Sequence, residues 1–161
     1  VDVGSAHGNH TLYALMKTPA EKVIAIEPDP NHLKVFEENL ALNGMTGSKK
    51  LKVISKFAGR SLKDDCITLD SLMPKILFPC FVMMDIEGAE VEALTGAEKF
   101  LKQPGCRWLV EIHSYELEKE CLKIFRSEGY TARIVDFYWW RFFIPDERPV
   151  ELSRWIVAYK E

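Results

Sequence analysis

Short apolar runs alternate with amphipathic stretches along most of the chain. The apolar runs predict strands at Val1–Gly4, Val23–Glu27, Leu51–Phe57, Phe81–Ile86 and Trp108–His113. The stretches between most of them repeat apolar residues every three or four positions, as a helix with one buried face does. This alternation predicts a mainly parallel sheet with helices on both faces.

The helical periodicity predicts four helices. They run from Gly8 to about Lys17, from Asn31 to Leu42, from Ala89 to Leu101 and from Tyr115 to Ser127. Asn31 is of a residue type that caps helix N-termini. The third helix has an apolar stripe of Val91, Leu94, Ala97 and Leu101, and a short connecting segment is predicted at Ile67–Met73.

Two further strands are predicted at Ala132–Phe137 and Arg154–Tyr159. No helical pattern separates them, so they should pair antiparallel. The predicted fold class is therefore α/β, with a Rossmann-like, doubly wound, mainly parallel sheet and a C-terminal antiparallel hairpin. A length of 161 residues fits one domain, residues 1–161. The chain opens on an apolar strand without a methionine, so we expect it to be truncated at the N-terminus, where a targeting segment would be lost.

Charge and composition exclude some partners. The net charge is −3 and the pI is about 5.9, which gives no general attraction to nucleic acid or anionic membrane. No apolar stretch approaches the roughly 20 residues that span a bilayer. The four cysteines, Cys66, Cys80, Cys106 and Cys121, form no CxxC pair. We therefore expect reduced thiols and a cytoplasmic protein.

The first motif is VDVGSAHGNHT, in which a buried strand ends at Gly4 and a second glycine, Gly8, opens a helix. Gly4 permits a tight turn, and Gly8 allows close packing of the helix start. The spacing is GxxxG, and dinucleotide-binding loops prefer GxGxxG. Asp2 lies in the strand, where a carboxylate needs a partner. A ligand's cationic amino group would supply one, or Asp2 only ties down the loop.

The second motif is VIAIEPDP, which places Glu27 at the end of the second strand. A carboxylate at that position, about twenty residues beyond a glycine loop, accepts hydrogen bonds from ribose hydroxyls. The alternative is an acid that balances the dipole of the next helix. With the glycine loop, Glu27 predicts a ligand that contains adenosine.

A set of five ordered segments resembles a known family. VDVGSAHG, IEPDP followed by ENLALNG, ITLDSL, MDIEGAEVEALTGAEKFL and LVEIH look like the FkbM family of S-adenosylmethionine-dependent methyltransferases. The resemblance covers roughly Val1 to Gly129. It implies a class I methyltransferase fold, S-adenosylmethionine as cofactor, and O-methylation of a hydroxyl on a sugar, glycan or other small metabolite. Because of the net charge, no nucleic acid is expected as a partner.

The resemblance also implies roles for individual residues. The cofactor loop would be lined by Asp2, Gly4 and Gly8, and the ribose held by Glu27 with Pro28 beside it. The block from Asp85 to Glu90 would lie at the mouth of the active site, with Glu87 on the substrate side. The segment Gly59–Ile67 should lie beside the adenine, although it is shorter and more charged than the family pattern.

A candidate for acceptor activation follows the fifth strand. Glu111 and His113 end that strand next to Asp85, and we expect Asp85 and His113 to face one cavity, with Glu111 on the substrate side. An imidazole titrates near neutrality and suits a general base. A structural hydrogen-bonding role for His113 is the alternative. A divalent ion on Asp85, Glu111 and His113 is another alternative, but no ligand spacing supports it, so no metal is expected.

The remaining signals are weaker. His7 and His10 flank Gly8 and are interpreted as polar residues of a loop and helix start. The aromatic segment Phe137–Pro145 either rims an acceptor pocket or packs at a hairpin tip. Two other function classes remain open: a methyltransferase-like module that binds without catalysis, and an NAD-dependent oxidoreductase. The GxxxG spacing and the DIEGAE block count against the oxidoreductase.

Overall fold

A computed structural model describes residues 1–135 and 154–160. Its strands are β1 (Asp2–Val3), β2 (Val23–Ile26), β3 (Leu51–Ile54), β4 (Phe57–Ala58), β5 (Cys66–Ile67), β6 (Cys80–Met84), β7 (Cys106–Ile112), β8 (Thr131–Val135) and β9 (Arg154–Tyr159). Its helices are α1 (Asn9–Lys17), α2 (Pro30–Leu42), α3 (Glu90–Thr95), α4 (Glu98–Leu101) and α5 (Tyr115–Ser127), with a 3-10 helix η1 (Asp70–Lys75). The segment Phe137–Pro145 lies outside the described residues.

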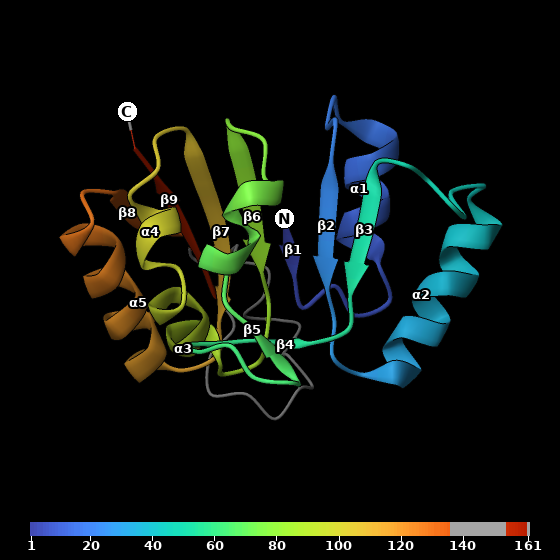
Figure 1. The fold of residues 1–161 in the computed structure, drawn as a ribbon. Coiled ribbons are helices and arrows are strands. Elements are labelled where there is room, and N and C mark those ends of the chain that lie inside the picture. Colours follow the sequence, from blue (N-terminus) through green and yellow to red (C-terminus); the bar gives the residue numbers. More distant parts are fainter. Residues whose placement is uncertain (136–153, 161) are drawn as a thin grey trace, which may run out of the picture.

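The main sheet has seven strands in the order β3-β2-β1-β6-β7-β9-β8. The neighbours from β3 to β7 pair parallel, and β9 pairs antiparallel with both β7 and β8. The expected doubly wound sheet with an antiparallel C-terminal hairpin is therefore confirmed. Because the strand order reverses between β1 and β6, a crevice is expected at their carboxyl ends. Figure 1 shows these ends meeting at one edge, near the ribbon of β4 and β5.

Both faces of the sheet are covered, as the alternation of side chains in β2 shows. Ile24 and Ile26 belong to the larger core cluster, whereas Ala25 points the other way and packs with Leu12 of α1 and Phe36 of α2. The larger cluster takes in residues of η1 and α3 to α5. Successive residues of a strand face opposite sides, so α1 and α2 cover one face and η1 and α3 to α5 cover the other.

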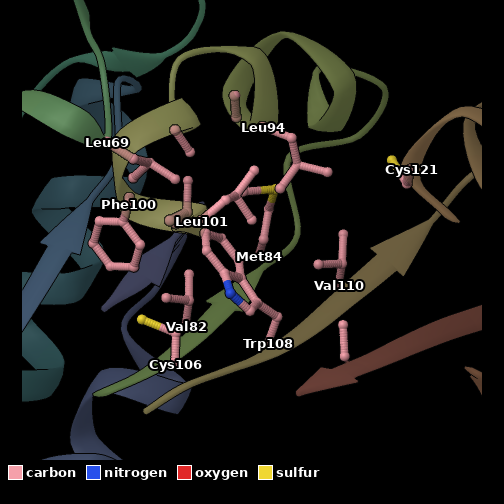
Figure 2. Packing of buried hydrophobic residues seen from close by; sticks show 14 of the residues in the cluster. Leu69, Val82, Met84, Leu94, Phe100, Leu101, Cys106, Trp108, Val110 and Cys121 are labelled. Carbon is pink, nitrogen blue, oxygen red and sulfur yellow. The ribbon is translucent and has the colours of Figure 1, made fainter. Parts of the chain in front are cut away.

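Trp108 is the centre of the larger core. Its ring makes edge-on contacts with Phe100 and Phe125, at centroid distances of 5.4 and 5.6 Å. Its indole Nε1 donates to the hydroxyl of Tyr130 at 3.2 Å, which satisfies the polar atom of a fully buried side chain. Figure 2 shows Trp108 among Met84, Leu94 and Leu101, so this core fixes β6 and β7 relative to α3 and α4.

The third predicted strand was too long. β3 ends at Ile54, and Phe57–Ala58 pairs with Cys66–Ile67 in a separate two-stranded ribbon. The predicted connecting segment at Ile67–Met73 instead contains the end of β5 and most of η1. An apolar run does not by itself reveal which partner a short strand takes.

The single helix predicted over Ala89–Leu101 is two helices, α3 and α4, with a break at Gly96 and Ala97. A Cβ on Gly96 would lie 2.0 Å from the carbonyl oxygen of Gly59. The carboxylate of Asp70 accepts from the backbone N–H groups of Lys99 and Phe100 and so caps α4 from a distance. These contacts between distant segments set the break.

The predicted N-cap of α2 was also wrong by two residues. Asp29 is the N-cap, and its side chain accepts from the backbone N–H of Asn31, which lies inside the first turn. Pro30 opens the helix, as proline often does at the first helical position.

The thiols follow the expectation. All four cysteines are free, with the sulfur atoms of Cys80 and Cys106 3.1 Å apart on β6 and β7. Within residues 1–135 and 154–160, no helix has the length and apolar character needed to cross a membrane.

Candidate active site

The first turn of the site is formed by Gly4, at the carboxyl end of β1. Gly4 has a φ of 80°, and its N–H donates to the carbonyl of Ile26 at 2.9 Å. A Cβ at this position would lie 1.9 Å from the carbonyl oxygen of Asp85. The glycine therefore brings the ends of β1, β2 and β6 together, which places the first turn directly beside Asp85.

Gly8 lets α1 begin against α2. It has a φ of 83°, and a Cβ there would lie 2.1 Å from the ring of Phe36. Among residues 1–135 and 154–160, no side chain caps the N-terminus of α1. The first backbone N–H groups of a helix have no partner within the helix, and they favour an anionic ligand group.

Asp2 faces α1 from β1. It is buried, and its Oδ2 accepts from the Thr11 hydroxyl at 2.6 Å. Burial raises the pKa of the Asp2 carboxyl group above its ordinary value, and the hydrogen bond from Thr11 opposes that shift. The partner that the sequence required for Asp2 is thus Thr11, at least for one of its two oxygens.

Replacing Asp2 with Asn should stabilise the fold near neutral pH. A carboxyl group with a raised folded-state pKa stabilises the protein below its unfolded-state pKa, and this contribution is lost as the pH rises through the folded-state value. Asn keeps an acceptor for Thr11 without the buried charge. We expect the melting temperature at pH 7 to rise by about 2–4 °C, the shift that ~1 kcal/mol produces in a domain of this size.

The comparison with pH 3.5 makes the Asp2 test specific, because the gain should vanish where the carboxyl group is protonated. Asp64→Asn, at an exposed position, is the control. An Asp2→Asn variant that melts earlier than wild type at pH 7 would show that the charge is stabilised by a partner.

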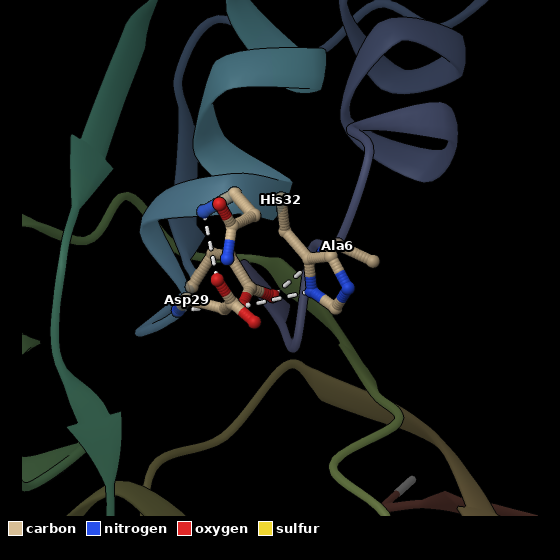
Figure 3. A network of polar contacts seen from close by, with 5 residues as sticks. Ala6, Asp29 and His32 are labelled. Atoms are coloured by element: carbon tan, nitrogen blue, oxygen red, sulfur yellow. Dashed lines mark hydrogen bonds and ion pairs between the residues drawn. The ribbon is translucent and has the colours of Figure 1, made fainter.

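Glu27 holds the loop and the start of α2 together. Its Oε2 accepts from the N–H of Ala6 at 2.8 Å, and its Oε1 accepts from the N–H of Asp29 at 2.9 Å. The ring Nδ1 of His32 lies 3.3 Å from Oε1 (Figure 3). Because a carboxylate has about four acceptor positions, Oε2 keeps one for a further donor such as a ribose hydroxyl.

A pocket of about 300 Å³ opens at these strand ends. It is lined by Val3, Gly4, Ala6, Ile26, Glu27, Pro28, Asp29, His32, Lys56, Phe57, Ala58, Asp85, Ile86, Glu87 and Ala89. Its volume is at the lower end of the range for small-molecule sites. Two of its residues, Ala6 and Glu87, have positive φ angles of 43° and 48°. Such backbone strain in residues other than glycine concentrates at functional sites.

The acidic end of this pocket continues into a buried cluster around His113. Its Nε2 lies 3.4 Å from Oδ1 of Asp85, and its Nδ1 lies 3.1 Å from Oε1 of Glu90. Suitable ligand atoms of Asp85, Glu111 and His113 all lie within 4.8 Å of one another. The hydrogen bond to Glu90 raises the pKa of His113, assisted by the nearby carboxylates of Asp85 and Glu111 and opposed by burial.

The predicted site residues divide into two groups. Gly4, Glu27, Pro28, Asp85 and Glu87 line the pocket, whereas Asp2, Gly8, Glu111 and His113 lie outside its lining. His113 contacts Asp85, so the expected meeting of these two side chains occurs, but the side chain of His113 is only 6% exposed against 30% for Asp85. No residue of Gly59–Ile67 lines the pocket; Phe57 and Ala58, just before it, do.

The sequence did not identify His32, Phe57 or Glu90 as site residues. Phe57 is an aromatic side chain that is 57% exposed at the pocket. In the sequence, only its place just beyond β3 could have marked it as a site residue. Glu90 is fully buried, although it lies in the DIEGAE block. A larger hollow of about 900 Å³, lined mainly by apolar residues such as Tyr13, Leu77 and Phe81, shares no residue with the pocket.

The strand order, the antiparallel β9 and the glycine turn beside an acidic strand end define the class I methyltransferase fold. Solved structures agree. A methyltransferase FkbM from Methylobacillus flagellatus has a TM-score of 0.73 at 21% identity, over 98% of this chain and 42% of that one. A precorrin-6Y methyltransferase from Geobacter metallireducens scores 0.67 at 14% identity, over 99% and 78%. An S-adenosylmethionine-dependent O-methyltransferase from Thermotoga maritima scores 0.62 at 15% identity, over 99% and 57%.

The chain belongs to the FkbM methyltransferase family. The FkbM methyltransferase domain model matches residues 55–137, just over half of the chain. The match confirms the resemblance that the ordered motifs carried. No curated protein matches the chain significantly. The chain spans less than half of the Methylobacillus protein, at 42% of its length.

The fold implies S-adenosylmethionine as cofactor. The residues at the strand ends fit such a molecule. The glycine turn at Gly4 leaves room where a Cβ would collide, the N-terminus of α1 has no side-chain cap, and Glu27 keeps an acceptor position.

Proposed function

We propose that this chain is the catalytic domain of an S-adenosylmethionine-dependent methyltransferase that methylates a hydroxyl group of a sugar, glycan or other small metabolite. One observation carries the proposal. The turn at Gly4, the carboxylate of Glu27 and the carboxylate of Asp85 line the same pocket, although they follow three different strands. A candidate acid for nucleoside binding and a candidate proton acceptor therefore border one cavity.

On the cofactor side, Glu27 would accept from the ribose through the remaining position on Oε2. Gly4 and Pro28 would border the nucleoside, and exposed Phe57 offers a flat surface for the adenine. Asp2 and Gly8 would act from behind the pocket, by holding the start of α1 through Thr11 and Phe36. When bound, S-adenosylmethionine supplies a methyl group that its sulfonium already activates, so little covalent chemistry is left to the protein.

On the acceptor side, Asp85 would take the proton of the hydroxyl. Asp85 lines the pocket, whereas His113 is buried behind it. We therefore assign the contact with the acceptor to Asp85 and a positioning role to His113, which Glu90 orients. During methyl transfer, the carboxylate of Asp85 would hold the proton that the acceptor hydroxyl gives up. Glu87, exposed at the same turn, would contact the acceptor.

The negative charge of the protein and of its pocket favours a small, uncharged acceptor. A net charge of −3 and the carboxylates of Asp85, Glu87 and Glu111 near the pocket would repel a phosphate backbone. The same carboxylates suit a hydroxyl, which needs a proton acceptor before it attacks. The alternative of a binding module without catalysis predicts cofactor affinity but no methyl transfer to any member of a panel of sugars and glycans.

Glu27→Ala should weaken binding of S-adenosylhomocysteine by about 10- to 100-fold, because a charge-assisted hydrogen bond to the ribose is lost. Isothermal titration calorimetry measures this directly. The variant should also melt earlier than wild type, because Glu27 accepts from the backbone N–H groups of both Ala6 and Asp29. Binding and stability therefore have to be separated.

Ser114→Ala is the matched control for Glu27. Ser114 caps α5 outside the pocket lining, and its Oγ accepts from the N–H of Leu117, so its loss costs about 1 kcal/mol of stability. This variant should keep wild-type affinity. Equal affinity in Glu27→Ala and wild type would make Glu27 a structural acid, and tighter binding of NAD than of S-adenosylhomocysteine would overturn the proposed function.

A further inference from the structure

Three potential metal ligands come from two neighbouring strands. Asp85 directly follows β6, Glu111 lies near the end of β7, and His113 directly follows β7. Glu111 and His113 are two residues apart, which is the spacing that places both on one side of a strand. Their ligand atoms and that of Asp85 lie within 4.8 Å of one another. Glu111 and His113 are buried, whereas Asp85 is half-buried and borders the pocket.

The histidine is held from behind. Oε1 of Glu90 lies 3.1 Å from Nδ1 of His113 and also accepts from the N–H of Gly88 at 3.1 Å. Glu90 is fully buried, so its carboxylate is fixed in place. With Nδ1 donating to Glu90, the Nε2 atom of His113 is directed at Asp85. A carboxylate that accepts from the distal ring nitrogen is the usual support of a metal-binding histidine.

Nε2 of His113 is buried and has no hydrogen-bond partner in the described part of the chain. Its separation of 3.4 Å from Oδ1 of Asp85 exceeds the roughly 2.7–2.9 Å of a charge-assisted hydrogen bond. Two ligands that share one ion at about 2.1–2.4 Å lie about 3 Å apart when adjacent and about 4.2–4.8 Å apart when opposite. The observed separations fall in that range.

We propose that Asp85, Glu111 and His113 bind a divalent transition-metal ion, with Glu90 as the residue that positions His113. One imidazole with two carboxylates combines the ligand preferences of ions such as Mn²⁺, Fe²⁺ and Zn²⁺, whereas Mg²⁺ and Ca²⁺ favour oxygen ligands alone. Three protein ligands leave coordination positions open toward the pocket that Asp85 lines.

The catalytic role of this ion rests on the proposed function, but the binding of the ion to the three residues does not. An acceptor hydroxyl in an open coordination position becomes more acidic, because the ion favours the alkoxide. The proton would then pass to Oδ2 of Asp85, since Oδ1 is buried toward His113. The ion would thus specify acceptors that can present an oxygen to it, such as sugars with adjacent hydroxyl groups.

The test uses Mn²⁺ as the probe, with no cofactor or acceptor present. The protein is treated with a chelator, exchanged into chelator-free buffer and titrated while electron paramagnetic resonance counts free Mn²⁺. We expect one ion per chain in wild type, and affinity reduced about tenfold or more in Asp85→Asn and Glu111→Gln. Glu90→Gln, which changes no ligand, should reduce affinity about 10- to 100-fold.

Glu38→Gln, at an exposed position of α2, is the matched control and should bind Mn²⁺ as wild type does. Circular dichroism checks that each variant is folded. Asp85→Asn changes a half-buried position, so it still tests metal binding if a variant at a buried position does not fold. Lack of saturable binding below about 1 mM Mn²⁺, or unchanged affinity in Asp85→Asn and Glu111→Gln, would overturn the metal site. Calorimetry with S-adenosylhomocysteine in chelator tests the proposed function separately.

Discussion

Asp85→Asn should lower kcat for methyl transfer by about 10²- to 10⁴-fold and leave the affinity for S-adenosylhomocysteine nearly unchanged. Asn has the size of Asp but cannot take up the acceptor proton. Asp85 lines the pocket with a partly exposed side chain, so the substitution should disturb packing little. The measurement is transfer of a labelled methyl group to the best acceptor from a panel of hydroxyl compounds, with calorimetry for the cofactor.

The kinetic test needs two further variants for comparison. Glu92→Gln removes another acid of the same region, one that pairs with Arg60 on the surface, and should keep wild-type turnover. His113→Gln should lower kcat less than Asp85→Asn does, because only Asp85 takes up the acceptor proton. Unchanged turnover in both Asp85→Asn and His113→Gln would mean that the pocket catalyses by positioning alone.

Gly4→Ala should be the most destabilising single-methyl change in the site, at about 2–5 kcal/mol. The positive φ of 80° costs a non-glycine residue about 1–2 kcal/mol. The added Cβ would lie 1.9 Å from the backbone oxygen of Asp85, so the ends of β1 and β6 have to separate, at a further cost of about 1–3 kcal/mol. Urea unfolding measures the loss of stability.

Gly129→Ala separates these two costs. Gly129 has nearly the same φ, 81°, but no atom of the described residues lies within 4 Å of the position of an added Cβ. It should lose only the conformational part, about 1–2 kcal/mol. Equal losses in the two variants would show that the contact between Gly4 and Asp85 does not constrain the site. Gly4→Ala should also weaken binding of S-adenosylhomocysteine, and Gly129→Ala should not.

The sheet could be predicted because its strands are buried on both faces. Runs such as Val23–Glu27 and Trp108–His113 are too apolar and too short for surface helices, and the helices between them require parallel pairing. Even the antiparallel pairing of Arg154–Tyr159 followed from the absence of a helical pattern before it. The strand bounds were right to within a few residues, except where β3 ends.

The errors occurred where distant segments decide local structure. The break between α3 and α4 depends on the contact of Gly96 with Gly59 and on Asp70, which caps α4 from η1. The ribbon of β4 and β5 depends on a pairing across a loop. Asp70 and Phe100 are 30 residues apart, so no short window of the sequence contains both partners of that contact. A window that contains both Phe57 and Cys66 still does not reveal that they pair.

The candidate site was predictable where one residue sits at a strand end, as with Gly4, Glu27 and Asp85. It was not predictable where a side chain works through another. Thr11 holds Asp2, and Glu90 holds His113 across 23 residues of sequence. Thr11 and Glu90 lie on helices, where a short polar or acidic residue is most often a solvated one, and only the packing of α1 and α3 shows otherwise.

Because of the position of β9, this sheet is completed late in the synthesis of the domain. β9 is inserted between β7 and β8, and it pairs with both. During synthesis, the edges of β7 and β8 that pair with β9 therefore stay unpaired until residues 154–159 have left the ribosome. Until then the nascent chain presents unpaired strand edges, which are templates for pairing with other chains. We therefore expect a nascent domain with this strand order to be most prone to pairing with other chains just before residues 154–159 emerge.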